Sequence, residues 1–259
     1  MSCGLLPGSA LTAQAEARSV AQDSAHLSVS GVGLTGPRHP VLLVPGWRDG
    51  AATMAPLEDL LRRAGWSDAR VARVDFQDPV GSNREHAQEI ADALEHLRAR
   101  TGVDRVDVVA HSMGGLATRY LLQKGGGEGV RRVVFIATPH HGSWTAYLAW
   151  GEGGKEMHPG SLFLLDLQAF RAVPSGVEAL TLRSKVDFHV LPPESGTLAG
   201  VPDVEICCPS HDGLLSHPEA FQAVHRFLTR EDLPPSPKPG NGEVPREAPA
   251  GEGTRMPGA

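Results

Sequence analysis

The stretch from Val108 to Leu122, VVAHSMGGLATRYLL, constrains the fold most, because an apolar run stops at a serine and a helical pattern starts directly after it. The apolar run is typical of a buried strand, and the later apolar positions recur at helical spacing. A change this abrupt requires a tight turn flanked by small residues, which Ala110, Gly114 and Gly115 provide. The stretch therefore predicts a strand, a tight turn that carries Ser112, and a helix.

Similar alternation runs through the middle of the chain, where short β-rich runs are separated by helical patterns. This alternation predicts an α/β fold with a mostly parallel central sheet and helices on both faces. The predicted strands are 41–44, 69–76, 105–111, 131–138, 177–187 and 204–209. The predicted helices start near Thr53, near Ser82, at Met113, near Ser161 and near Pro218. At the second helix, Ser82 and Glu85 have the spacing of a capping box.

The 259 residues divide by composition into three zones. Residues 1–37 are rich in Ala, Ser and Gly with poor periodicity, which predicts a partly disordered lead-in. Residues 233–259 contain so much Pro and Gly that we expect a disordered tail. Residues 38–232 then form one α/β domain, which carries every candidate site residue. Small residues from Leu5 to Ala17 resemble a cleavage region, but without a preceding basic segment there is no clear signal peptide, and both a cytoplasmic and a secreted location stay open.

Charge and cysteine content limit the classes of partner. A formal net charge of −6, without a cluster of Lys and Arg, argues against nucleic acid as a partner. No apolar run approaches the roughly 20 residues that a bilayer span needs. The three cysteines, Cys3, Cys207 and Cys208, do not make a disulfide framework, and we interpret the adjacent pair as buried thiols in a strand.

Ser112 is the candidate nucleophile, because a hydroxyl on such a turn stands free beside the start of a helix. A nucleophilic serine needs a base that is oriented by an acid, and with turns of this kind both follow the serine in the chain. Asp187 ends a predicted strand and His211 follows the last one, so both fall at the carboxyl edge of the sheet, where ligands gather. The competing acids are Asp166, Asp203 and Asp212, and the competing bases are His189, His217 and His225.

Nucleophilic attack on a carbonyl also requires hydrogen-bond donors for the negatively charged oxygen that forms. The backbone N–H after the nucleophile, here that of Met113, is one expected donor. The loop after the first strand, with the sequence PGWRDG, supplies the other. Pro45 has no N–H, whereas Gly46 permits a tight turn, so the candidate donor is the amide of Trp47.

Five motifs, AHSMGGL, TPHHGS, HPGSLFLLDL, SKVDFHVLP and HDGLL, follow one another between about residues 41 and 228. In these motifs the chain resembles the bacterial lipases of the α/β-hydrolase superfamily, especially the lipase A-like, class 2 triacylglycerol lipase group. The resemblance implies an α/β-hydrolase fold and a serine carboxylic-ester hydrolase that acts through an acyl-enzyme. It implies the site residues Ser112 as nucleophile, Asp187 as acid, His211 as base, and the Trp47 and Met113 amides as oxyanion hole.

Two features depart from the resemblance. Family members usually have His-Gly where this chain has Pro45 and Gly46, which puts the geometry of the second donor in doubt. The segment from residue 144 to residue 160 offers only a short cap over the site. Within it, Trp144, Tyr147, Leu148 and Trp150 are apolar enough to line a substrate pocket, or alternatively to pack against the sheet.

This chemistry requires no cofactor, and we expect no metal, since the sequence has no carboxylate-dense loop of the kind that calcium prefers. The expected partner is a small-molecule or lipid ester, with transient contact to a lipid surface, and the expected state is a monomer. Two alternatives stay open: an acyltransferase or thioesterase that uses the same three residues, and a binding module without catalysis.

Overall fold

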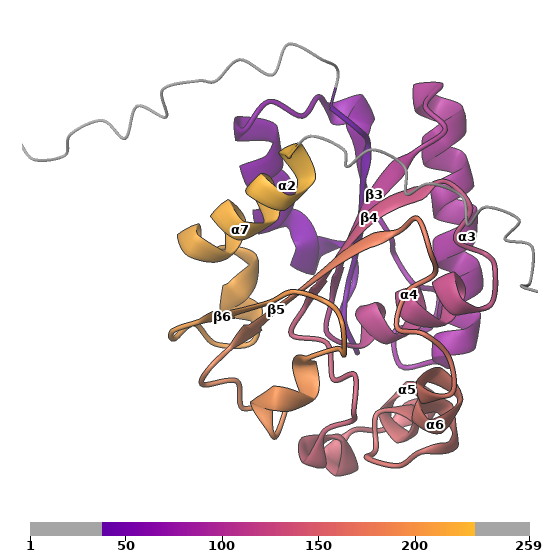
Figure 1. Cartoon of the computed structure of the whole chain (residues 1–259), viewed down its shortest axis with the longest axis vertical. Helices are drawn as coiled ribbons and strands as arrows, with labels where there is room; N and C mark the ends of the chain where they lie inside the picture. The colour runs from indigo at the N-terminus through magenta and orange to yellow at the C-terminus, as the bar shows by residue number, and fades with distance from the viewer. Residues whose placement is uncertain (1–37, 231–259) are drawn as a thin grey trace, which may run out of the picture. The chain divides into compact units, whose positions relative to one another are not determined.

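The computed structural model describes residues 38–230, and within them six parallel strands form one sheet in the order β2-β1-β3-β4-β5-β6 (Figure 1). The strands are β1 (Val41–Val44), β2 (Val71–Arg73), β3 (Val106–His111), β4 (Val130–Ile136), β5 (Glu178–Ser184) and β6 (Asp203–Ile206). Because β1 lies between β2 and β3, the strand order reverses there. The carboxyl ends of β1 and β3 thus flank the switch point at which open α/β sheets bind ligands.

Helices cover both faces of the sheet (Figure 1). One face packs against α2 (Ala55–Arg63) and α7 (Pro218–Thr229), and the other against α3 (Asn83–Thr101) and α4 (Met113–Gln123). Two short helices, α5 (Gly151–Glu156) and α6 (Leu162–Gln168), follow β4 and lie beyond the carboxyl end of the sheet (Figure 1). The short 3-10 turns are η1 (Ala51–Met54), η2 (Asp68–Arg70), η3 (Trp144–Leu148), η4 (Pro193–Gly196) and η5 (Asp212–Leu215).

The strand β1 shows why an unbroken apolar run suits this position. Val41 and Leu43 belong to the core on the α2 and α7 face, whereas Leu42 and Val44 belong to the core on the α3 and α4 face. All four side chains are fully buried. A strand covered on both faces needs apolar residues at every position, so the predicted α/β class with a parallel sheet is confirmed.

Each predicted strand overlaps one observed strand, but four ends were predicted too far along the chain, and β4 and β6 begin one residue before the predicted starts. The range 69–76 shortens at both ends to β2, since residues 68–70 form the turn η2 and the strand stops at Arg73, and the range 131–138 ends with β4 at Ile136. The range 177–187 ends with β5 at Ser184, so Asp187 lies in the loop three residues beyond the strand. The range 204–209 ends with β6 at Ile206. Side-chain pattern alone does not show where the hydrogen-bonded pairing between strands stops.

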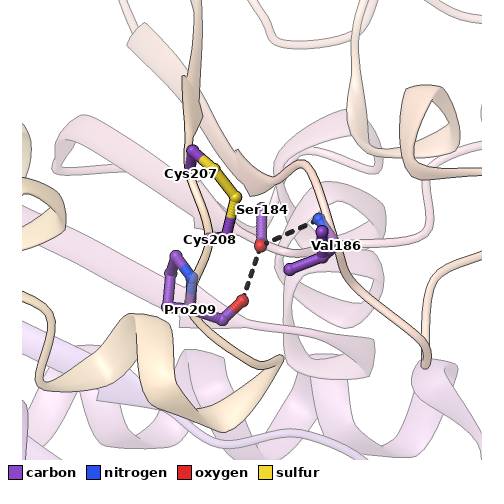
Figure 2. Close-up of a disulfide and its surroundings, with 5 residues drawn as sticks. All are labelled: Ser184, Val186, Cys207, Cys208 and Pro209. Carbon is purple, nitrogen blue, oxygen red and sulfur yellow. Dashed lines mark hydrogen bonds between the residues drawn. A yellow bond between two sulfur atoms is a disulfide. The ribbon is translucent and has the colours of Figure 1, made fainter.

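The interpretation of Cys207 and Cys208 as buried thiols is wrong. Both residues are exposed, they follow the end of the edge strand β6, and their sulfurs form a disulfide (Figure 2). Next to them, the Ser184 hydroxyl donates a 2.6 Å hydrogen bond to the carbonyl of Pro209 and accepts a 3.2 Å bond from the Val186 N–H (Figure 2). Ser184 thereby joins the two loops that lead to the candidate acid and base.

The start of α3 is capped differently from the prediction. Ser82 is the N-cap residue, and its hydroxyl accepts a hydrogen bond from the Arg84 N–H. The carboxylate that meets this helix end is that of Glu156 in α5 rather than that of Glu85. It accepts bonds from the Ser82 hydroxyl at 2.8 Å and from the Asn83 N–H at 2.7 Å. The cap over the site is therefore attached to α3 through a buried carboxylate.

The predicted lead-in, residues 1–37, and the predicted tail, residues 233–259, lie outside the described residues. Within residues 38–230, no helix combines the length and the apolar character that a membrane span requires.

Candidate active site

Ser112 occupies a strained turn between β3 and α4. Its φ of 53° and ψ of −128° are unusual for a residue with a side chain, and such strain concentrates at functional sites. A side chain at Gly114 would clash with the carbonyl of Pro45, and one at Gly115 would clash with Thr138. The two glycines are thus needed because the loops after β1 and β4 pass close to the turn.

Asp187 and His211 form a buried pair. The Asp187 carboxylate lies 2.7 Å from Nδ1 of His211, and it also accepts the backbone N–H groups of His189 at 2.7 Å and Val190 at 3.0 Å. Burial opposes ionisation of Asp187, but these hydrogen bonds outweigh it and hold the pKa of Asp187 below its usual range. Asp187 is therefore an ionised carboxylate that fixes the orientation of the His211 ring.

A cavity of about 440 Å³ opens at the carboxyl ends of the strands, and both Ser112 and His211 line it. The hydrogen bonds among the described residues include the Asp187 and His211 pair but none between Ser112 and His211. The hydrogen bond between a nucleophile and its base is often long in an unliganded site and shortens when substrate binds. The other lining residues are Trp47, Arg48, Asp49, Pro139, Ser143, Thr145, Ala146, Leu148, Ala149, Trp150, Met157, Phe188, His189, Val190 and Asp212.

Of the competing acids, two lie away from the cavity. Asp166 pairs with Lys124 at 2.9 Å, and Asp203 opens β6, where it accepts a hydrogen bond from Thr181 at 2.7 Å. Asp212 lines the cavity, but the carboxylate bonded to Nδ1 of the histidine is that of Asp187. The contacts of the described residues favour Asp187 as the acid.

Of the competing bases, His217 and His225 lie at the start of α7 and within it, and neither lines the cavity. The ring of His225 packs against Trp66, as expected for a packing residue. His189 does line the cavity, with its ring centroid 4.8 Å from that of His211. The histidine that shares a hydrogen bond with a buried carboxylate is nevertheless His211, whose Nδ1 donates to Asp187.

The two candidate oxyanion donors have free N–H groups within the described part of the chain. Met113 begins α4, so its N–H has no partner inside the helix. No described residue accepts a hydrogen bond from the backbone N–H of Trp47. The next backbone N–H, that of Arg48, donates to the carbonyl of Pro79 at 2.8 Å. The Trp47 ring is held in place because its Nε1 donates to the carbonyl of Trp150 at 3.0 Å.

The structure brings two of the four predicted pocket residues into the cavity. Leu148 and Trp150 line it, whereas Trp144 and Tyr147 do not. Tyr147 instead stacks on His158, with ring centroids 4.2 Å apart. The apolar lining residues that sequence reasoning missed are Ala146, Ala149, Met157, Phe188 and Val190. The position of Phe188 directly after Asp187, in a loop expected at the site, is a signal that could have identified it.

His111, the residue before the nucleophile, is fully buried against the ring of His211, with centroids 4.6 Å apart. Neither of its ring nitrogens has a hydrogen-bond partner among the described residues. Burial lowers the pKa of His111 well below its usual value, and the charge of His211 adds to this effect. His111 is therefore a neutral ring that adds no charge next to the base.

Two groups of side chains in residues 38–230 place atoms that could ligate a metal within 4.8 Å of one another. One group is His111, His211 and Asp212, and the other is Asp187, His189 and His211. Both include His211, so a metal ion bound at either would compete with the proton on that ring.

Comparison with known proteins agrees with this architecture. A family model described as alpha/beta hydrolase fold matches residues 39–160. The mature lipase BlEst2 of Bacillus licheniformis is similar with a TM-score of 0.65 and 16% identity, over 75% of this chain and 93% of that one. Lipase B of Aspergillus fumigatus has a TM-score of 0.66 and 23% identity, over 82% of this chain and 57% of that one. The product of the Listeria innocua gene lin2722 has a TM-score of 0.59 and 16% identity, over 76% of this chain and 96% of that one.

The family model spans β1 to β4 and includes the turn that carries Ser112, and the solved structures share the overall fold. The chain thus has the α/β-hydrolase fold that the sequence motifs indicate.

Proposed function

We propose that the protein is a serine carboxylic-ester hydrolase of the lipase and esterase type. The observation that carries the proposal is the strained turn at Ser112, which opens into the same cavity as a histidine already bonded to a buried carboxylate. The α/β-hydrolase fold is compatible with many functions, so the proposal depends on these side chains rather than on the fold.

In the proposed reaction, His211 takes the proton of the Ser112 hydroxyl as its oxygen attacks the ester carbonyl. Because Nδ1 of His211 is bonded to Asp187, Nε2 is the nitrogen that transfers the proton. The N–H groups of Met113 and Trp47 stabilise the negatively charged oxygen of the tetrahedral intermediate. His211 then protonates the departing alcohol, and a water molecule repeats the sequence on the acyl-enzyme to release the carboxylic acid.

The side chains that line the cavity favour an ester substrate with an apolar portion. On the cap side, Leu148, Ala149, Trp150 and Met157 offer apolar surface, and Phe188 faces the cavity from the loop that carries Asp187. An acyltransferase or a thioesterase would use the same three residues with a different acceptor or leaving group. We rank these second, because solved structures with a similar fold are described as lipases.

The test is hydrolysis of p-nitrophenyl esters of increasing acyl length by the wild type and by Ser112→Ala. We expect activity in the wild type and its loss, by about 10³-fold or more, in the variant. The acyl length with the highest kcat/KM distinguishes a lipase from a short-chain esterase. Equal activity of the two proteins would exclude Ser112 as the nucleophile, and thiol-ester hydrolysis that exceeds oxygen-ester hydrolysis would favour a thioesterase.

A further inference from the structure

Two carboxylates beside the candidate nucleophile have no counterion. Asp49 and Asp212 both line the cavity, and neither forms an ion pair within residues 38–230. A Cβ atom added at Gly46 would lie 2.9 Å from the Ser112 Cβ and 3.1 Å from the Asp49 carboxylate, so both groups lie next to Gly46. Asp212 directly follows His211, and its carboxylate lies within 4.8 Å of a ring nitrogen of that residue.

The positive charges nearby compensate these carboxylates only in part. Among the described lining residues, only Arg48 carries a permanent positive charge, and its guanidinium packs over the rings of Trp47 and Trp150, at 5.5 and 5.3 Å from their centroids. Burial and the charge of Asp212 raise the pKa of Asp49, whereas Thr53, His211 and Arg48 lower it less. The cavity therefore has a negative potential on the side of Asp49 and Asp212.

The proposed mechanism identifies the part of the substrate that meets this potential. In the proposed reaction His211 donates its proton to the departing alcohol, so the alcohol portion of the ester lies against His211. Asp212 is the next residue, and Asp49 belongs to the loop after β1, which also carries the proposed donor Trp47. The apolar cap residues, Leu148 and Ala149 among them, are left for the acyl portion.

We propose that Asp49 and Asp212 select esters by the charge of their alcohol: the site accepts neutral and cationic alcohols, such as amino alcohols and quaternary ammonium alcohols, and rejects anionic ones. This inference rests on the proposed ester hydrolysis, since it assigns the alcohol to the side of His211. An anionic group placed beside two carboxylates is repelled, and a cationic group is attracted, with more effect at low salt.

The experiment uses three esters of one acyl group, chosen as the best in the p-nitrophenyl series. The alcohols are choline, its neutral isostere 3,3-dimethylbutanol, and the anionic 2-hydroxyethanesulfonate. We expect the wild type to show a kcat/KM for the choline ester at least about tenfold above that for the sulfonate ester. In the double variant Asp49→Asn and Asp212→Asn, this ratio should fall towards one. Glu95→Gln, which removes an exposed charge on α3, should keep the wild-type ratio.

A second arm separates the selectivity from the chemistry. Trp47 and Trp150 line the cavity, so binding of the same three esters to Ser112→Ala can be followed by tryptophan fluorescence. A charge preference in Kd without turnover by the wild type would support charge selection by Asp49 and Asp212 but overturn the hydrolase, and with it the assignment of the alcohol to the side of His211. Turnover by the wild type with equal kcat/KM for the cationic and anionic esters, or a ratio that the double variant leaves unchanged, would overturn the inference and keep the hydrolase.

Discussion

Asp187 is the residue on which the proposed proton transfer depends. It is 2% exposed, and its two oxygens are occupied by the His211 ring and by two backbone N–H groups. A carboxylate held in this way keeps the proton of the imidazole on Nδ1 and leaves Nε2 to act as the base.

Asp187→Asn should keep the fold but lower kcat for ester hydrolysis by about 10⁴-fold, because an amide favours the wrong tautomer of His211. The measurement is kcat on the best p-nitrophenyl ester, with far-UV circular dichroism as the check on folding. Asp166→Asn is the matched control, since Asp166 pairs with Lys124 away from the cavity, and it should leave kcat unchanged. A folded Asp187→Asn protein with wild-type turnover would remove Asp187 from the mechanism.

The lowered pKa of Asp187 also predicts how stability depends on pH. A carboxylate whose pKa is lower in the folded state stabilises the fold above its unfolded pKa of about 3.9, and this contribution is lost as pH falls through the folded pKa. The free energy of unfolding in urea should therefore differ more between wild type and Asp187→Asn at about pH 7 than at about pH 2.5. The same difference at both pH values would show that the ionised form of Asp187 contributes nothing specific.

Single residues of the site were predictable to different degrees. The turn at Ser112 is local, since the small residues and the strand and helix patterns lie within fifteen positions. Asp187 and His211 followed from chain order and from the edge of the sheet. Asp49 was missed, because its position beside Ser112 depends on how the loop after β1 folds over the turn between β3 and α4.

At the scale of elements, the cap is fastened to the body of the domain at α5. Glu156 at the end of α5 is 4% exposed and accepts hydrogen bonds from Ser82, from the backbone and side chain of Asn83, and from Arg84. The capping-box spacing predicted a local partner for Ser82 instead. Because the partner comes from a helix more than 70 positions away in the sequence, no local pattern could have shown it.

Glu156→Gln should destabilise the protein by about 1–3 kcal/mol, because it leaves buried donors at the start of α3 poorly paired. The measurement is the free energy of unfolding in urea. Glu152→Gln on the same helix is the control: its side chain is 57% exposed and pairs with Lys155, so the loss should be below about 1 kcal/mol. Equal effects of the two substitutions would show that Glu156 does not fasten the cap.

For the whole molecule, the order of the strands explains why the site lies where it does. The reversal at β1 places the loops after β1 and β3 side by side, and the loops after β5 and β6 bring Asp187 and His211 to the same edge. The alternation of strands and helices predicted the parallel sheet but not the order of its strands. The composition of the cavity was predictable only in part: the apolar cap segment indicated Trp150, whereas Phe188 comes from a loop whose path depends on the assembled fold.

The central claim is that Ser112 is an activated nucleophile, and covalent labelling tests it most directly. The folded protein is treated with a serine-reactive fluorophosphonate, and the modified peptide is identified by mass spectrometry. We predict one label per chain, on Ser112, with labelling abolished in Ser112→Ala and slowed in Asp187→Asn. A folded wild-type protein that stays unlabelled, or that is labelled equally well in Ser112→Ala, would contradict the claim.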